Sequence, residues 1–283
     1  MNPEEFRRRG HELIDWVADY RAGLDARPVM AQTAPGDIRA ALPASPPQGA
    51  EPFDAILADL DRVILPGLSH WQHPSFFGYF PSNGTLASVL GDFTSTGLGV
   101  LGLAWQSSPA LTELEEVVCD WLRQMIGLEA AWQGVIQDTA STSTLVALVS
   151  ARERATGFSL TRAGLQGEAA PLSVYTTRHS HSSVEKAALL AGFGRDNLRI
   201  VDHDHAYAMS ATSLASAIAS DRARGVVPCA VVATTGSTAT TALDPLKEIG
   251  AVAAREGVWM HVDAAMAGSA MILPECRWMW DGI

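Results

Sequence analysis

Apolar and polar residues in the first 84 positions alternate with a helical period, but their pattern does not predict a compact hydrophobic core. Residues 3–26 and 53–65 each carry apolar side chains at the spacing of an amphipathic helix. The stretch 27–52 between them is rich in proline, alanine and glycine, which excludes a regular helix there. We therefore expect residues 1–84 to form a helical extension that packs on another domain or subunit.

Helix-like and strand-like segments alternate from about residue 85 onward. Helices are expected at 85–100, 109–126, 142–156, 182–192, 211–223 and 245–256, and strands at 134–137, 173–176, 198–201, 229–234 and 258–263. This alternation predicts an α/β fold in which helices cover both faces of a parallel sheet. Ligands bind such sheets beyond the C-terminal ends of the strands, where the polar clusters of this sequence fall.

The last predicted strand ends on a carboxylate. The apolar segment 258–262 leads directly into Asp263, and the small residues of 264–269 follow. A buried carboxylate is costly unless a cation meets it, and small residues leave room for a flat ligand. A pyridinium ring suits both features, which suggests pyridoxal 5'-phosphate (PLP). Enzymes that use PLP hold it through a lysine, and this chain has only Lys186 and Lys247.

Two clusters rich in serine and threonine follow other strands. Residues 137–144 stand at a predicted helix start, where free backbone N–H groups and the helix dipole favour a phosphate. Ordinary N-capping would use the same residue types. Residues 234–241 form a second cluster, which is either another wall of the site or simply a polar loop.

Histidine and aromatic residues form two further candidate groups. His179 and His181 follow the strand at 173–176, but no third ligand stands at a recognisable spacing, so we predict no metal site. A histidine at a strand end either stacks on an aromatic cofactor or caps its own turn. The aromatic stretch 73–82 suits the apolar wall of a pocket, although such runs are more often core.

Charge and cysteine content narrow the class of protein. The 283 residues carry a net charge of −11, which argues against nucleic acid or an anionic membrane as partner. The three cysteines have no CxxC spacing and fit a reducing compartment. No basic-then-apolar leader and no apolar run of spanning length is present, so we expect a cytoplasmic protein.

Five motifs in order resemble the group II PLP-dependent amino-acid decarboxylases, in particular bacterial aromatic-L-amino-acid decarboxylases. They are HPSFFGYFPSNG, SSPALTELEEVVCDWL, GVIQDTASTSTLVAL, HSHSSVEKAALLAG and HVDAAMAGSAMILPE. The resemblance covers essentially the whole chain. It implies the aspartate-aminotransferase-like fold (fold type I) in an obligate homodimer. Residues 1–84 would wrap around the partner subunit, and residues 85–283 would form the first part of the PLP-binding large domain.

The resemblance also implies roles for individual residues. Asp263 would pair with the pyridine nitrogen and His181 would stack on the ring, as the two catalytic residues. Other cofactor contacts would come from Thr139, Ala140 and Ser141 at the phosphate, Thr238 near the cofactor and Ala265 beneath the ring. The substrate side would be formed by Trp71, Tyr79, Phe80, Pro81 and Ser82, with Leu101 and Leu103 reaching the pocket from the partner subunit.

One departure from the family pattern concerns the covalent lysine. The family carries it in an Asn-x-His-Lys-Trp-like motif shortly beyond the segment that matches 274–282, and neither Lys186 nor Lys247 matches that motif. We therefore expect the chain to be the N-terminal portion of a decarboxylase, lacking the mobile loop and the small C-terminal domain and inactive alone. The expected reaction converts an aromatic L-amino acid to an arylethylamine and CO₂. An aromatic acetaldehyde synthase of the same family and a non-catalytic module that dimerises or binds PLP remain alternatives.

Overall fold

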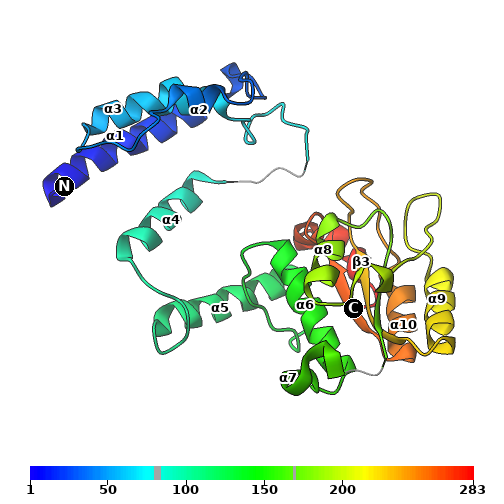
Figure 1. Ribbon diagram of the computed structural model, residues 1–283. Coiled ribbons are helices and arrows are strands. Elements are labelled where there is room, and N and C mark those ends of the chain that lie inside the picture. Colours follow the sequence, from blue (N-terminus) through cyan, green and yellow to red (C-terminus); the bar gives the residue numbers. More distant parts are fainter. Residues whose placement is uncertain (80–83, 168–169) are drawn as a thin grey trace. The chain divides into compact units, whose positions relative to one another are not determined.

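The computed structural model describes residues 1–79, 84–167 and 170–283 (Figure 1). The chain divides into two compact units, Met1–Gly99 and Val100–Ile283, and each is described by itself. The division predicted after residue 84, between a helical extension and a PLP-binding domain, stays a prediction.

Helices make up the regular structure of the described residues of the first unit. Helix α1 (Pro3–Ala22) begins at Asn2, whose side chain accepts a hydrogen bond from the Glu5 N–H at 2.8 Å, and a 3₁₀ turn over Leu24–Ala26 follows it. Helix α3 (Phe53–Asp59) continues into a π-helical turn at Leu60–Ile64. Helix α4 (Leu86–Leu98) begins at Thr85 and ends at Gly99, which has a φ of 60°. The predicted helices at 3–26, 53–65 and 85–100 are confirmed.

The prediction that 27–52 holds no regular helix is wrong in one place. Helix α2 (Asp37–Ala41) forms a single turn there, after Gly36 with a φ of 103°. These five residues contain no proline, and the Asp37 carboxylate accepts a hydrogen bond from the Ala34 N–H at 2.7 Å. The absence of proline from these five residues permits one helical turn between the flanking prolines.

A parallel four-stranded sheet organises the second unit. Its strands are β1 (Leu172–Thr176), β2 (Leu198–Ile200), β3 (Val227–Thr234) and β4 (Trp259–Asp263), in the order β2-β1-β3-β4. All three neighbouring pairs are parallel. The predicted strands at 173–176, 198–201, 229–234 and 258–263 are confirmed, and all four point their C-terminal ends to one edge.

Helices flank this sheet on both faces, as predicted. The unit contains α5 (Pro109–Met125), α6 (Ala140–Ala155), α7 (Leu160–Ala163), α8 (Ser182–Leu190), α9 (Ala211–Ala223) and α10 (Leu246–Glu256). Short 3₁₀ segments follow β4 at Gly268–Ile272 and Pro274–Trp280. Figure 1 shows α6 and α8 on one side of β3 and α9 and α10 on the other.

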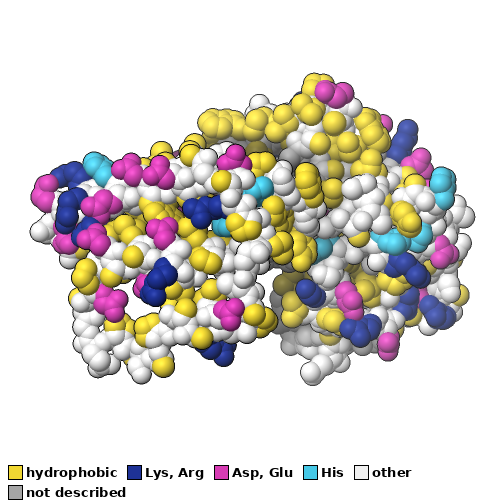
Figure 2. Space-filling view, turned by 90° about the horizontal axis from the view of Figure 1, so that it is seen from above, with side chains coloured by type: hydrophobic (Ala, Val, Ile, Leu, Met, Phe, Trp, Pro, Cys, Tyr) yellow, Lys and Arg dark blue, Asp and Glu magenta, His cyan; other side chains and the backbone are white. Residues whose placement is uncertain are grey.

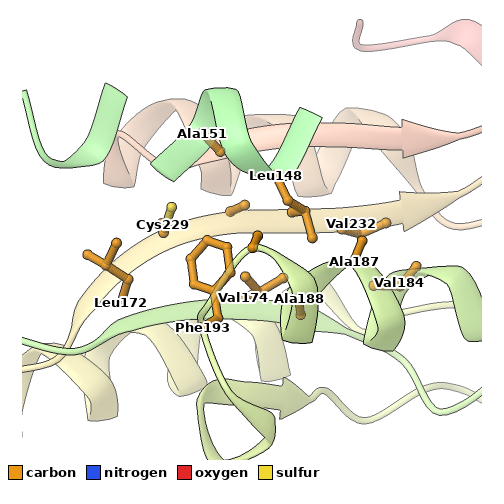
Figure 3. Close-up of a cluster of buried hydrophobic side chains, with 12 residues drawn as sticks. Leu148, Ala151, Leu172, Val174, Val184, Ala187, Ala188, Phe193, Cys229 and Val232 are labelled. Carbon is orange, nitrogen blue, oxygen red and sulfur yellow. The ribbon is translucent and has the colours of Figure 1, made fainter. Parts of the chain in front are cut away.

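Two hydrophobic clusters fill the spaces between sheet and helices. In the first, Leu148 of α6 and Val184 of α8 pack on Val174 of β1 (Figure 3). In the second, Tyr175 of β1 packs with residues of α9 and α10. Because successive side chains of a strand point to opposite faces, the neighbours Val174 and Tyr175 serve different clusters. Burial on both faces accounts for the nearly continuous apolar run of β3.

The strand predicted at 134–137 is not formed. The Ile136 N–H donates to the Glu115 carboxylate at 2.8 Å, and within the described residues this segment pairs with no strand. Val135 and Ile136 are 66% and 60% exposed. An apolar run predicts a tendency to extend, but a strand also needs a neighbour to complete its hydrogen bonds.

Candidate functional site

The C-terminal ends of β3 and β4 bring Thr234, Thr235 and Asp263 together. Thr234 lies opposite Asp263 in the ladder, and the Thr235 N–H donates to the Asp263 carbonyl at 2.9 Å. The half-buried Asp263 carboxylate accepts one hydrogen bond from the Ala265 N–H, at 3.1 Å. The carboxylate keeps acceptor capacity for a cationic ligand at this edge of the sheet.

A second carboxylate, Asp244, lies buried beside these residues. It accepts hydrogen bonds from the backbone N–H groups of Met209 and Thr234, both at 2.7 Å. Burial raises the pKa of Asp244, against the opposing effect of these two hydrogen bonds. Asp244 was not predicted from the sequence, because its partners come from distant segments. The available signal was an acidic residue directly after an apolar one, just past the polar cluster at 234–241. We call Thr234, Thr235, Asp244 and Asp263 the strand-end cluster.

Two hydroxyl groups of the strand-end cluster are buried without a partner. Within the described part of the chain, Thr234 Oγ1 and Thr235 Oγ1 make no hydrogen bond. A buried polar group without a partner is costly, so such groups call for an explanation by function. Next to them, Gly236 has a φ of 76°, and a Cβ there would lie 2.8 Å from the Ala267 Cβ. Glycine thus lets the loop after β3 approach the small residues after Asp263.

The turn between β1 and α8 presents His181 at the same edge of the sheet. His181 is the N-cap of α8, and its Nδ1 accepts a hydrogen bond from the Ser183 N–H at 3.2 Å. Because a neutral imidazole has one N–H and one acceptor nitrogen, its proton is then on Nε2. His181 is exposed, so the ring is available to a ligand. The capping role that the sequence left open is confirmed.

Thr139, Ala140 and Ser141 form the start of α6, which packs on β3 and β4. The Thr139 hydroxyl accepts a hydrogen bond from the Thr142 N–H at 3.2 Å and so caps the helix. The first backbone N–H groups of a helix have no partner within it, which makes this exposed turn suitable for an anion. Thr238 and Ala265 are also exposed, in the loops that follow β3 and β4.

The substrate-side residues predicted from the sequence are distributed over both units. In the first unit, the Trp71 ring stacks on Phe76 and on Tyr79, with centroid distances of 4.9 and 5.6 Å. Phe80, Pro81 and Ser82 lie outside the described residues. In the second unit, Leu101 and Leu103 are exposed.

Neither a metal cluster nor a membrane span is found in the parts of the chain that the structure describes. No three or more His, Cys, Asp or Glu side chains of these residues are grouped to hold a metal ion. No described helix is both long and apolar enough to cross a bilayer. The cysteines Cys119, Cys229 and Cys276 are free thiols, and burial raises the pKa of Cys229 to about 12. The cytoplasmic location predicted partly from these cysteines stays a prediction.

Comparison with known proteins assigns the chain to a family. Residues 35–283 match the family described as the pyridoxal-dependent decarboxylase conserved domain. The chain belongs to the pyridoxal-dependent decarboxylases. It is 41% identical over 297 residues to the aromatic-L-amino-acid decarboxylase of Rattus norvegicus, with 100% of this chain and 61% of the relative covered. It is 40% identical over 291 residues to the phenylacetaldehyde synthase of Arabidopsis thaliana, with 100% and 58% covered.

The fold of a solved decarboxylase matches that of this chain. The crystal structure of Oryza sativa TDC with PLP and tryptamine superimposes with a TM-score of 0.92 at 38% identity, covering 100% of this chain and 62% of that one. The α/β fold predicted from the sequence is confirmed. The chain spans about three-fifths of the length of these relatives.

The residues of this chain fit the cofactor of the family, PLP. Within the described residues, a carboxylate with one hydrogen bond stands beside two unpaired buried hydroxyls and a stretch of small side chains. A protonated pyridine ring with polar substituents would satisfy these groups. The start of α6 would suit the phosphate of the same molecule.

Proposed function

We propose that this chain forms the cofactor-binding part of an enzyme that decarboxylates an aromatic L-amino acid to the arylethylamine and CO₂. The observation that carries the proposal is Asp263, a half-buried carboxylate that ends β4 next to two buried hydroxyls that no described residue pairs with. The identity of 41% to an aromatic-L-amino-acid decarboxylase supports the reaction and the substrate class.

When bound, PLP supplies a ring that accepts the electron pair left behind as CO₂ departs. Asp263 would keep the ring nitrogen protonated, because a negative charge at hydrogen-bond distance favours the charged form of its partner. The Ala265 N–H, which donates to Asp263 Oδ1, would hold that carboxylate in place.

The remaining cofactor contacts would come from the loops at the same sheet edge. His181 would stack on the ring face, with its orientation set by the Ser183 N–H. Thr139, Ala140 and Ser141 would bind the phosphate at the start of α6. Thr238 would place a hydroxyl near the cofactor, and Ala265 would leave space beneath the ring.

The substrate side would be apolar and shared between two copies of the chain. Trp71 and Tyr79, together with Phe80, Pro81 and Ser82, would form the wall against the aromatic side chain of the substrate. Leu101 and Leu103 would reach the pocket of the partner subunit, and their high exposure within one chain supports burial against a second copy. We further propose that this homodimer is cytoplasmic.

The covalent link to PLP would come from another stretch of polypeptide. Lys186 lies on α8 and Lys247 lies in the first turn of α10, so both lysines are on helices and neither ends a strand. The chain alone would therefore be inactive. An aromatic acetaldehyde synthase is the second candidate, because the chain is 40% identical to the Arabidopsis phenylacetaldehyde synthase.

A complementation assay tests this function. The chain is co-expressed with the part of the rat relative that it does not cover, and we call the product the completed enzyme. With PLP, it should release CO₂ and an arylethylamine from carboxyl-labelled L-DOPA, L-phenylalanine, L-tyrosine or L-tryptophan. Aldehyde with peroxide in place of the amine would favour the synthase. If the two parts associate and bind PLP but release neither product, the result would favour a non-catalytic module.

A further inference from the structure

Two histidines outside the proposed cofactor contacts meet at the C-terminal edge of the sheet. His179 lies in the turn between β1 and α8, and His203 lies in the loop between β2 and α9. Their Nε2 atoms are 3.1 Å apart. The two segments start from neighbouring strands, because β1 pairs with β2 up to Thr176 and Ile200. The contact therefore joins two loops that the sheet has already brought together.

The proton positions of this pair follow from the geometry. His203 Nδ1 lies 2.8 Å from the Asp204 carbonyl oxygen, which only accepts, so Nδ1 carries the hydrogen. Nε2 of a neutral His203 is then an acceptor. With both rings neutral, His179 Nε2 therefore donates its hydrogen to His203 Nε2. If the hydrogen of His203 were on Nε2 instead, the lone pair of its Nδ1 would face a lone pair of the Asp204 carbonyl oxygen.

The ring of Tyr207 packs against both histidine rings. Its ring centroid lies 4.8 Å from that of His179 and 5.5 Å from that of His203. Tyr207 has a φ of 65°, a conformation that a tyrosine keeps only where its surroundings hold it. The Asp204 carboxylate shapes the loop by accepting hydrogen bonds from Ala206 and Ala208, at 2.8 and 3.0 Å.

The turn that His179 belongs to also carries His181. Between them, the Ser180 hydroxyl lies 2.6 Å from Thr176 Oγ1, at the end of β1. His181 itself is attached to α8 through Ser183. The hydrogen bond between His179 and His203 links this turn to the β2–α9 loop.

We propose that His179 and His203 are positioning residues whose hydrogen bond holds the β1–α8 turn and so sets the place of His181 against the cofactor. The first part concerns the chain alone, whereas the effect on the cofactor rests on the proposed function. A metal ion between the two imidazoles is the competing explanation. No third ligand joins them within the described residues, which favours the hydrogen bond.

Two variants separate the hydrogen bond from the packing of the ring. His203→Phe keeps an aromatic ring beside Tyr207 but removes the acceptor, whereas His203→Gln places an amide oxygen near the position of Nε2. In the cofactor-free chain, His203→Phe should raise amide hydrogen exchange in residues 177–181 about 2- to 10-fold, and His203→Gln should restore protection. Equal exchange in all three proteins would overturn the proposal, as would equal loss in both variants.

Nitrogen-15 NMR of the histidine rings provides a signature that mere packing would not produce. The expected pattern is a proton on Nδ1 of His203 and on Nε2 of His179. Reversed tautomers would overturn the assignment. Loss of the pattern on addition of EDTA would do so as well, because it would identify a bound metal ion.

Titration with PLP then tests the effect on the cofactor in the completed enzyme. His203→Phe should weaken PLP binding about 2- to 10-fold and His203→Gln should recover it. Unchanged PLP affinity with a loosened turn would refute the positioning role while leaving the proposed function intact. If the unsubstituted enzyme binds no PLP, the proposed function fails, and the exchange and NMR results alone decide whether the pair holds the turn.

Discussion

The charge of Asp263 and its ability to accept a hydrogen bond can be separated by one substitution. Asp263→Asn keeps an oxygen for the Ala265 N–H and removes the negative charge. We predict that it weakens PLP binding to the completed enzyme about 10- to 100-fold, because a hydrogen bond to a charged group is lost. Spectroscopic titration with PLP measures this. Asp92→Asn, at an exposed carboxylate of α4, is the control and should leave the affinity unchanged.

His261 should make the stability of the chain depend on pH. Burial lowers the pKa of this half-buried residue below its ordinary 6.5, against the opposing charge of Asp263. The unfolded chain then takes up a proton at a higher pH than the folded one. The stabilisation is fully present above pH 6.5 and is lost as the pH falls toward the lower folded value.

Urea unfolding between pH 5 and pH 8 tests this prediction. His261→Gln should reduce the fall in the free energy of unfolding by up to about 1.4 kcal/mol per pH unit. The same pH dependence in both proteins would show that His261 does not contribute.

At the scale of single residues, the sequence predicted those whose role is local. Asp263 follows an apolar strand and Thr139 opens a helix, so neighbouring residues sufficed to place them. Asp244 depends on Met209, which is 35 residues away, and the unpaired state of Thr235 depends on burial by the whole fold. Neither could be predicted without the tertiary structure.

Among the elements, β1, β2 and α9 are joined by one buried polar network. Asp221 of α9 is fully buried and accepts hydrogen bonds from the Tyr175 hydroxyl at 2.8 Å and from Arg199 at 2.9 Å, and it also pairs with Arg224. Burial alone would raise the pKa of Asp221, but these hydrogen bonds outweigh it and lower the pKa below 3.8. The network therefore stabilises the fold above pH 3.8 and loses that effect as the pH falls further.

Removing the Asp221 carboxylate should lower the free energy of unfolding more than removing the Tyr175 hydroxyl that donates to it. We predict that Asp221→Ala lowers the free energy of unfolding by about 2–4 kcal/mol, because Tyr175 and Arg199 both lose their acceptor. Tyr175→Phe should cost about 1 kcal/mol. Chemical denaturation compares the two, and equal losses would count against the network.

Prediction of the elements succeeded where burial determines the pattern. Val174 and Val231 are fully buried, and both lie in strands that the sequence predicted, at 173–176 and 229–234. Ile136 is apolar too, but its segment has no neighbouring strand within the described residues. The turn of α2 spans only five residues, too few to show a hydrophobic period, so the pattern gave no sign of it.

For the whole molecule, exposed apolar side chains predict association between copies of the chain. On α5, Leu114, Val117 and Trp121 are exposed at the spacing of one helix face. Figure 2 shows that hydrophobic side chains also gather in broad areas of the face it draws. Such areas on a protein surface indicate an interface.

Sedimentation velocity tests this association. The chain should sediment as a dimer or larger species, and Trp121→Glu should raise its dissociation constant at least about 10-fold. Glu116→Gln, at a polar position of the same helix, should have no such effect. A monomer at high concentration would contradict the proposed homodimer.

The protonation state of the bound cofactor tests the role of the strand-end cluster most directly. PLP labelled with nitrogen-15 in its pyridine ring is bound to the completed enzyme, and the ring nitrogen is observed by NMR. We predict a protonated nitrogen in the unsubstituted enzyme and a neutral one in Asp263→Asn. A neutral ring nitrogen opposite an intact Asp263, or protonation that survives the substitution, would contradict the account.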